Sequence, residues 1–523
     1  MKRRQFLKAG ASAAAVPLLS GRLQAAYGMS PLAALAPQGA ADRVLVVIRL
    51  DGGNDGLNTV LPLDQYENLA KARSNILIPA EKALKLDDLT GFHPSMTGLH
   101  ALYQEGKVKV VQAVGYPNHN QSHFRSTDIW FTASDSNQVL DSGWLGRYLD
   151  GIFPNFPDGY PNADFPDPPA VQIGSVLSTI LQGDKVPVGM AVSSPTNVAS
   201  LVQGGVDTPP ATPAGHELTF IRQMADQTTK YGDSIRKAVA AATNLSTLYP
   251  ATGNRLSDQL KGVARLIAGG LRTRVYVVSL GGFDTHAAQI DGAVGDPTLG
   301  AHATLLQRVS EAVTAFQDDL KLLGVEDRVM GLTISEFGRR ILSNASFGTD
   351  HGTASPLLVF GKGVAGGLLG ANPVIPALVT SKENVAMQHD FRSVYASLLK
   401  DWMGASPAEM QKVLLKDFPI LPLVGSTGIR PAGARPSAVG LDQNFPNPFR
   451  GATTLRYRVP AGERVTLKVF GPRGEMVRVL ADGYHPAGTY QKSLEAGGLS
   501  PGTYFYRLQV GGRVMTRSME LLR

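Results

Sequence analysis

The chain has 523 residues, with 50 Lys and Arg, 43 Asp and Glu, and no cysteine. The absence of cysteine excludes a disulfide scaffold, a thiolate zinc site and a cysteine nucleophile. A hydrophobic content of 43% suits a globular core. No uninterrupted apolar run reaches the roughly 18 residues of a membrane-spanning helix, so we expect a protein that does not span a membrane.

The net charge of +7 is unevenly distributed along the chain. Residues 1–41 carry five basic residues and no acid, whereas residues 442–523 carry twelve basic and six acidic residues. Residues 42–426 carry 31 basic and 37 acidic residues. Because the central part is mildly acidic, we expect no nucleic-acid partner for it.

The leader, residues 1–41, begins MKRRQFLKAG. The pair Arg3 and Arg4 before a weakly apolar stretch is typical of a twin-arginine signal peptide. A cationic amphipathic helix is the alternative, but Gly10 and Pro17 disfavour a long helix. We therefore expect the twin-arginine translocase to export the folded protein to the periplasm.

The C-terminal part differs from the rest in composition and pattern. Residues 425–440 are rich in Gly, Pro and Ser and predict a linker. Residues 441–523 hold short alternating strands between turns, which predict an immunoglobulin-like β-sandwich. With NFPNPF at its start and GTYFYRL near its end, this segment resembles the C-terminal sorting domain of type IX secretion substrates. The resemblance implies type IX secretion machinery as a partner and a cell-surface or extracellular location; the alternative is an adhesion module.

The central part, residues 42–424, alternates predicted strands and helices. The strands are expected at 44–50, 108–114, 274–280, 328–335 and 355–361, and the helices at 96–105, 124–132, 216–245, 256–268 and 302–323. This alternation predicts an α/β domain with helices on both faces of a sheet. In such sheets function gathers where strands end, so the loops there are the first place to look for a site.

The first two strands are followed by polar motifs. Asp51 and Asp55 lie among glycines in DGGNDGLNT, where their carboxylates suit a metal ion, although a polar turn with Asx hydrogen bonds is an equal alternative. After the second strand, Ser122 stands at a helix start as a candidate nucleophile, and Arg125 as a clamp for an oxyanion. The alternative there is a capping serine beside a surface arginine.

Carboxylates and histidines lie at three further strand ends. Asp284 and His286 follow the strand 274–280, and Glu336 follows the strand 328–335. Asp350 and His351 directly precede the strand 355–361, and this convergence predicts a metal site.

The order of these motifs resembles the alkaline phosphatase superfamily, which includes sulfatases. Within it, GGNDGLNTV, GGFDTH and SEFGRR…GTDHG closely resemble a large bacterial family of exported proteins with a domain of unknown function. The resemblance implies an alkaline-phosphatase-like three-layer sandwich and a divalent metal, with zinc first and calcium or manganese as alternatives. It assigns a first-strand metal ligand to Asp51 or Asp55, the nucleophile to Ser122, a ligand pair to Asp284 and His286, the next acid to Glu336 and the late histidine to His351.

The sequence departs from the superfamily pattern in three places. Glu336-Phe337 stands where the superfamily usually has Asp-His, so one nitrogen ligand is missing, and Asp284 and His286 lie closer together than the usual ligand pair. The Cys-x-Pro-Ser-Arg motif of sulfatases is absent, so the formylglycine route is absent too. The converging motifs and the resemblance together favour an exported, metal-dependent hydrolase of phosphate or sulfate esters acting on a small ester or glycan. The alternative is a non-catalytic cell-surface or matrix-binding protein with a degenerate form of this fold.

Overall fold

The computed structural model describes residues 42–193, 229–293, 295–425, 439–444, 446–459, 463–485 and 488–522. These residues form two compact units, which we call the body (42–425) and the tail (439–522). The expected leader and nearly all of the expected linker lie outside the described residues. Within the described residues, no helix has both the length and the apolar character needed to cross a bilayer.

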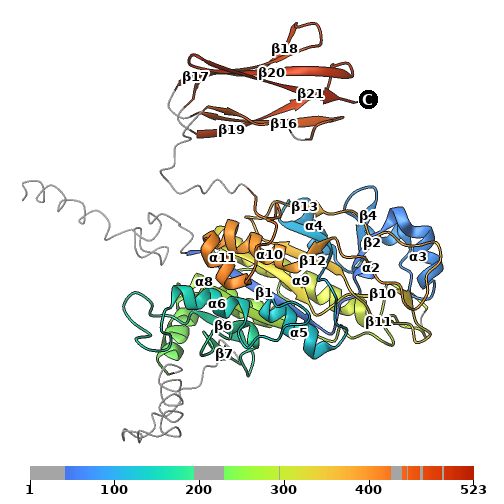
Figure 1. Cartoon of the computed structure of the whole chain (residues 1–523), viewed down its shortest axis with the longest axis vertical. Helices are drawn as coiled ribbons and strands as arrows, with labels where there is room; N and C mark the ends of the chain where they lie inside the picture. The colour runs from blue at the N-terminus through green and yellow to red at the C-terminus, as the bar shows by residue number, and fades with distance from the viewer. Residues whose placement is uncertain are drawn as a thin grey trace, which may run out of the picture. The chain divides into compact units, whose positions relative to one another are not determined.

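A mixed nine-stranded sheet forms the centre of the body (Figure 1). In spatial order its strands are β13 (Gly367–Leu369), β5 (Val108–Gly115), β12 (Ser355–Phe360), β9 (Val329–Ser335), β1 (Val44–Asp51), β8 (Val275–Gly281), β6 (Ala170–Ile173) and β7 (Met190–Val192), and β14 (His389–Asp390) pairs with β5. Strand β1 is parallel to both neighbours and buried along most of its length. Such nearly continuous apolar runs are typical of strands covered on both faces.

Strand β12 runs antiparallel to both of its neighbours, β5 and β9. Its first residue therefore lies at the edge where β5, β9, β1 and β8 end. Loops that follow the parallel strands and the loop that precedes β12 thus meet at one edge of the sheet. We call this edge the site edge.

Two groups of helices pack within the body. Helices α4 (Thr97–Gln104) and α8 (Arg255–Ala268) both contact α9 (Ala301–Leu322), while α6 (Trp144–Ile152) and α10 (Phe391–Ser397) both contact α11 (Pro407–Leu414). Helix α8 buries Leu256, Leu260, Val263 and Ile267, whose spacing of three or four residues gives it one apolar face.

Smaller elements complete the body around the site edge. They are α2 (Gly56–Thr59), α3 (Tyr66–Arg73), α5 (His123–Thr132), the three-stranded sheet β2 (Val60–Pro62), β4 (Thr90–Phe92) and β3 (Leu84–Lys85), and the pair β10 (Arg339–Ser343) and β11 (Thr349–His351).

The predicted α/β class with a central sheet is confirmed, and the five predicted strands agree with β1, β5, β8, β9 and β12 to within a residue at each end. Four predicted helices agree similarly well with α4, α5, α8 and α9. The fifth, 216–245, is only partly described. Residues 229–241 are helical and residues 242–245 are not, so the prediction was too long at its C-terminal end.

The tail consists of two antiparallel sheets that share one apolar core, compatible with the predicted β-sandwich. One sheet holds β15 (Gly440–Leu441), β16 (Ala452–Val459) and β19 (Gly488–Glu495), and the other holds β18 (Met476–His485), β17 (Glu463–Phe470), β20 (Gly502–Val510) and β21 (Arg513–Leu521). Strand β18 was not predicted, because two register shifts against β17 disrupt its alternation of apolar and polar residues.

Candidate metal centre

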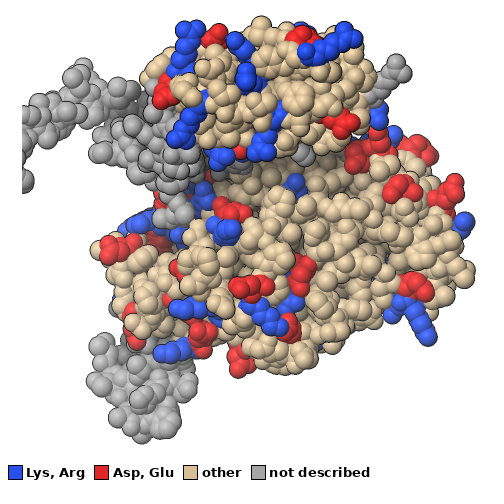
Figure 2. All heavy atoms as spheres, turned by 45° about the horizontal axis from the view of Figure 1, so that its top comes forward, with Lys and Arg blue, Asp and Glu red and all other residues tan. Residues whose placement is uncertain are grey.

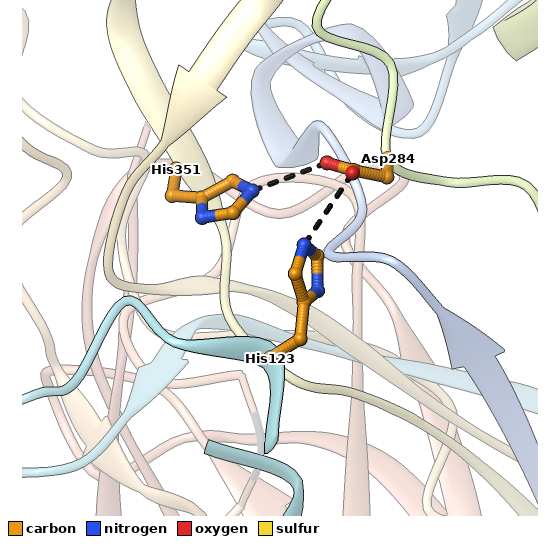
Figure 3. Close-up of side chains that lie close together, drawn as sticks. All are labelled: His123, Asp284 and His351. Atoms are coloured by element: carbon orange, nitrogen blue, oxygen red, sulfur yellow. Dashed lines mark hydrogen bonds and ion pairs between the residues drawn. The ribbon is translucent and has the colours of Figure 1, made fainter. Parts of the chain in front are cut away.

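Three side chains that can bind a metal ion, those of His123, Asp284 and His351, have donor atoms within 4.8 Å of one another at the site edge (Figure 3), and a fourth, that of His286, contacts Asp284 beside them. His123 is the first residue of α5, in the segment that follows β5. Asp284 and the fourth residue, His286, lie in the loop after β8, and His351 ends β11 shortly before β12 begins. Strands far apart in the sequence therefore bring these residues together.

The donor atoms of these residues converge on the carboxylate of Asp284. Its Oδ1 lies 3.1 Å from Nε2 of His351 and 3.2 Å from Nε2 of His286. Those two Nε2 atoms lie 2.8 Å from each other. Nε2 of His123 lies 3.4 Å from the other carboxylate oxygen, Oδ2. Three imidazole nitrogens thus lie within 3.4 Å of the carboxylate of Asp284.

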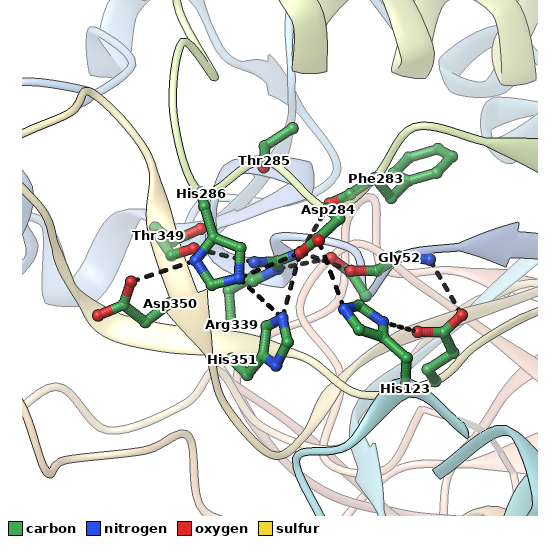
Figure 4. A network of polar contacts seen from close by, with 12 residues as sticks. Gly52, His123, Phe283, Asp284, Thr285, His286, Arg339, Thr349, Asp350 and His351 are labelled. Atoms are coloured by element: carbon green, nitrogen blue, oxygen red, sulfur yellow. Dashed lines mark hydrogen bonds and ion pairs between the residues drawn. The ribbon is translucent and has the colours of Figure 1, made fainter. Parts of the chain in front are cut away.

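Each of the three histidines is oriented through its other ring nitrogen, Nδ1, and Figure 4 shows these contacts for His123 and His286. The Nδ1 contacts are Glu336 Oε2 at 2.5 Å for His123, Asp350 Oδ1 at 3.3 Å for His286, and the backbone carbonyl of Gln121 at 2.8 Å for His351. Each of these oxygens can only accept a hydrogen bond, so each Nδ1 donates, and in a neutral ring Nε2 then carries a lone pair. Metal-binding histidines are held in this way.

This arrangement fits a divalent metal ion. Two neutral imidazoles whose Nε2 lone pairs face each other at 2.8 Å repel unless a cation or a proton lies between them. The set of three nitrogens and one carboxylate oxygen is a donor set that zinc accepts, whereas calcium prefers oxygen ligands. The residues that would hold the ion are His123, Asp284, His286 and His351.

Arg339 holds the carboxylate of Asp284 in place through its buried guanidinium. Its side chain is fully buried, and its guanidinium donates to Asp284 Oδ1 at 2.7 Å and to the backbone carbonyls of Gly53, Phe283 and Thr349. Partial burial raises the pKa of Asp284, but the hydrogen bond and charge of Arg339, together with the contacts to His351 and His286, outweigh it and lower the pKa to about 2. The carboxylate is therefore charged at neutral pH.

The glycine after β1 allows the loop of Asp284 to approach. Gly52 has φ of +119°, and a Cβ at this position would lie 2.3 Å from the backbone nitrogen of Asp284. Its own backbone N–H donates to Oε1 of Glu336 at 3.2 Å. The Gly-rich motif thus serves close packing of two loops and the positioning of Glu336.

The structure brings most of the predicted metal residues together, in two different positions. Asp284, His286 and His351 offer donor atoms at the centre, whereas Glu336 and Asp350 lie behind the histidines and orient them. A carboxylate in that second position raises the basicity of the histidine that it contacts.

The two aspartates after β1 do not join the centre. Oδ1 of Asp51 pairs with Arg49 at 2.8 Å, and Asp51 lines a narrow pocket with Glu336. Asp55 is fully buried, and both of its oxygens accept from Nη1 of Arg73 at 3.0 and 2.9 Å. Its Oδ2 also accepts from Gln289 at 2.7 Å, so the structure uses Asp55 as the core of a buried polar network.

The two predicted catalytic residues lie at the N-terminal end of α5, Ser122 directly before the helix and Arg125 in its first turn. Ser122 is exposed and immediately precedes His123, at the N-terminal end of the helix. The guanidinium of Arg125 instead donates to the backbone carbonyls of Asp135, Ser136 and Gln138. The structure therefore commits Arg125 to the loop after α5 and not to the centre.

Sequence reasoning missed His123 as a donor. Phe337 occupies the position of the histidine expected from the superfamily pattern, and its ring packs at 4.3 Å from the ring of His351 and 5.1 Å from that of His123. His123 thus lies beside Phe337 and faces the Asp284 carboxylate with its Nε2 atom. The sequence did contain a signal for His123, because it stands at the start of a predicted helix in the segment that follows β5.

Comparison with protein families matches residues 41–401 to the family described as "Protein of unknown function (DUF1501)". The chain belongs to this family. Residues 443–519 of this DUF1501 protein match the "Secretion system C-terminal sorting domain", which confirms the predicted type IX sorting domain. A search of curated proteins found no significant match.

Solved structures similar to this DUF1501 protein include members of the alkaline phosphatase superfamily. A superfamily protein from Vibrio parahaemolyticus has 11% identity and a TM-score of 0.30, covering 84% of this chain and 83% of that chain. The PsFucS1 sulfatase from Pseudoalteromonas sp. has 12% identity and a TM-score of 0.30, covering 95% and 88%. Latent PorU from Porphyromonas gingivalis has 21% identity and a TM-score of 0.15, and the match spans 17% of this chain and 10% of that chain.

Proposed function

We propose that the body is a metal-dependent hydrolase of phosphate or sulfate esters. The observation that carries this proposal is the shared orientation of three histidines, whose Nδ1 atoms are all held by acceptors while their Nε2 atoms converge on Asp284. A bound divalent ion would supply positive charge that lowers the pKa of a nearby hydroxyl and stabilises a developing oxyanion. The nitrogen-rich donor set favours zinc over manganese or calcium.

Ser122 is the proposed nucleophile. Its position directly before His123 keeps its hydroxyl at the start of α5, where backbone N–H groups favour an anionic group. Its oxygen would bond to the phosphorus or sulfur of the ester while the alcohol leaves, and water would then release phosphate or sulfate. Arg125 has no part in this proposal, because its guanidinium already bonds backbone carbonyls.

The ends of the chain supply the proposed route out of the cell. Arg3 and Arg4 would direct the folded protein through the twin-arginine translocase into the periplasm. The sorting domain in the tail would then direct it through the type IX secretion machinery to the cell surface or the medium. Replacing both arginines with lysine should leave the precursor in the cytoplasm, and normal export of that variant would contradict this route.

The hydrolase proposal is tested by an ester screen of the purified full chain. Phosphate and sulfate monoesters are offered with zinc, manganese or calcium, and released phosphate and sulfate are measured. Ser122→Ala should lower kcat on the order of 10³-fold or more, while the exposed Ser74→Ala serves as the matched control. Equal rates for Ser122→Ala and wild type would remove Ser122 from the proposal. Stoichiometric metal without hydrolysis of any ester would instead favour the non-catalytic surface-binding protein.

A further inference from the structure

The outward face of the four-stranded sheet in the tail has an unusual charge arrangement. Along β17 and β20, the residues Val465, Leu467, Tyr506 and Leu508 are buried and point into the core. Their neighbours Lys468 and Arg507 therefore point outward. The sheet register places these two cations directly opposite each other on adjacent strands.

No acid lies in the row of described residues that crosses the four strands at this level, which reads Val479, Lys468, Arg507 and Thr516. The ion pairs between described residues of the tail are Arg458 with Asp442 and Arg464 with Asp482, and neither involves Lys468 or Arg507. Like charges directly opposite each other destabilise a sheet, so the fold itself gains nothing from this pair.

The same face also exposes apolar side chains around the two cations. The next row toward one end reads Met476, Phe470, Phe505 and Ser518. Met476, Val479, Phe505 and Val514 are each at least 42% exposed, and Tyr484, which lies opposite Arg464, is 73% exposed. Figure 2, in which the top of Figure 1 comes forward, shows more Lys and Arg than Asp and Glu on the tail.

We propose that this outward face, which we call the cationic face, docks onto an acidic protein surface bordered by apolar side chains. Charge complementarity indicates that the partner surface is acidic where it meets Lys468 and Arg507, because neither cation pairs with an acid among the described residues. The exposed aromatic and aliphatic residues identify its border, since aromatic side chains and arginine are enriched at protein interfaces. This inference rests on the proposed export of the chain, because the tail is its sorting domain.

Charge reversal at Lys468 separates a docking role from a structural one. Lys468→Glu places an acid opposite Arg507, so it should raise the unfolding midpoint of the tail by about 1–5 °C at low salt. Docking should nevertheless fail, because the partner is acidic. A residue that merely supports the fold would show the opposite sign, with loss of stability and loss of export together.

The experiment measures surface display of the full chain in cells that carry type IX secretion machinery, with scanning calorimetry of the purified variants. Lys468→Glu and Arg507→Glu should lower the displayed fraction several-fold. Lys492→Glu, the same change in the other sheet, should leave display unchanged. Normal display of Lys468→Glu, or a fall in its midpoint, overturns the proposal.

Two further outcomes would point away from an acidic protein partner. Phosphatidylglycerol vesicles test for an anionic lipid in its place. If wild type sediments with these vesicles and Lys468→Glu does not, the face binds membrane and the protein-partner proposal is wrong. If wild type itself is not displayed, the proposed export fails, and the cationic face loses its basis with it.

Discussion

Nε2 of His286 and Nε2 of His351 lie 2.8 Å apart, closer to each other than either lies to the Asp284 oxygen that they share. Each ring donates its Nδ1 proton elsewhere, so two neutral rings would present lone pairs to each other. Such a pair is stable only with a proton or a metal ion between the nitrogens. The Asp284 carboxylate, which is charged at neutral pH, stabilises either cation at this point, so the metal content of the purified chain decides between them.

The first prediction concerns metal content. The wild-type chain should retain about one zinc ion after dialysis, and His351→Ala should retain far less, since removal of a neutral nitrogen ligand opens the coordination shell. Plasma mass spectrometry of the dialysed proteins measures this. His100→Ala, on α4 and away from the centre, is the matched control. Equal zinc in both variants would count against the centre.

Glu336→Gln tests the position of this carboxylate behind His123. The amide keeps the size of the side chain but removes the charge that fixes the Nδ1 proton, so zinc affinity should fall about 10–100-fold without loss of the site. Competition with a fluorescent chelator measures the affinity. A complete loss of zinc would mean that Glu336 is a direct ligand, and Glu81→Gln, on the surface, should change nothing.

Asp55→Asn should destabilise the body without affecting the metal. The carboxylate and Arg73 form a buried ion pair with side chains 1% and 0% exposed, and loss of one charge leaves the other uncompensated. We expect the free energy of unfolding to fall by about 3–5 kcal/mol in urea titrations. Zinc content should match wild type, and the exposed Asp88→Asn should match it in stability. Loss of zinc from a folded Asp55→Asn would restore Asp55 as a ligand.

The same ion pair predicts a pH dependence. Burial raises the pKa of Asp55, but the charges of Arg73 and His302 and the hydrogen bonds from Gln289 and Arg73 together outweigh it, so the net pKa is lowered. A lowered pKa stabilises the fold fully above the unfolded value of about 3.9, and this stabilisation is lost as pH falls through the folded value. The stability difference between wild type and Asp55→Asn should therefore be constant from about pH 5 to 7 and shrink below pH 4. A difference that grows on acidification would contradict the assignment.

Truncation tests the independence of the two units. The tail has its own apolar core, whereas Trp130, Trp144 and Trp402 all belong to the core of the body. Deleting residues 441–523 should leave the tryptophan fluorescence transition of the body unchanged in midpoint and slope. In calorimetry of the full chain, the tail should contribute a separate transition. A shift of several degrees in the body would show that the two cores are coupled.

The fold was largely predictable because the central strands are nearly continuous apolar runs. Runs such as 44–50 and 274–280 are typical of buried strands, and their alternation with helical patterns indicates the α/β class. The antiparallel direction of β12 was not predictable from its residues, since the pairing of a short apolar strand depends on neighbours far away in the sequence. Strand β18 escaped prediction for a local reason, its register shifts.

The sequence predicted which residues lie at the candidate site better than it predicted what each of them does there. Asp284, His286 and His351 were recognisable because each lies beside a strand end. Residue type does not distinguish a side chain that binds the metal from one that orients a metal-binding histidine. The sequence analysis therefore took Glu336 for a ligand, whereas in the structure its oxygen contacts Nδ1 of His123. Asp55 was also proposed as a ligand because it is an acid close to a strand end. In the structure it instead forms a buried ion pair with Arg73 on α3.

The antiparallel course of β12 has a consequence for the order of events during folding. Only Asp284 and His286 are neighbours in the sequence; His123 follows β5 and His351 ends β11, so both join them only through the pairing of distant strands such as β5 with β12. A partly folded chain thus offers a metal two donors at most from one loop. The ion should enter only a finished sheet, so the identity of the bound metal would record the compartment in which the chain completed its folding.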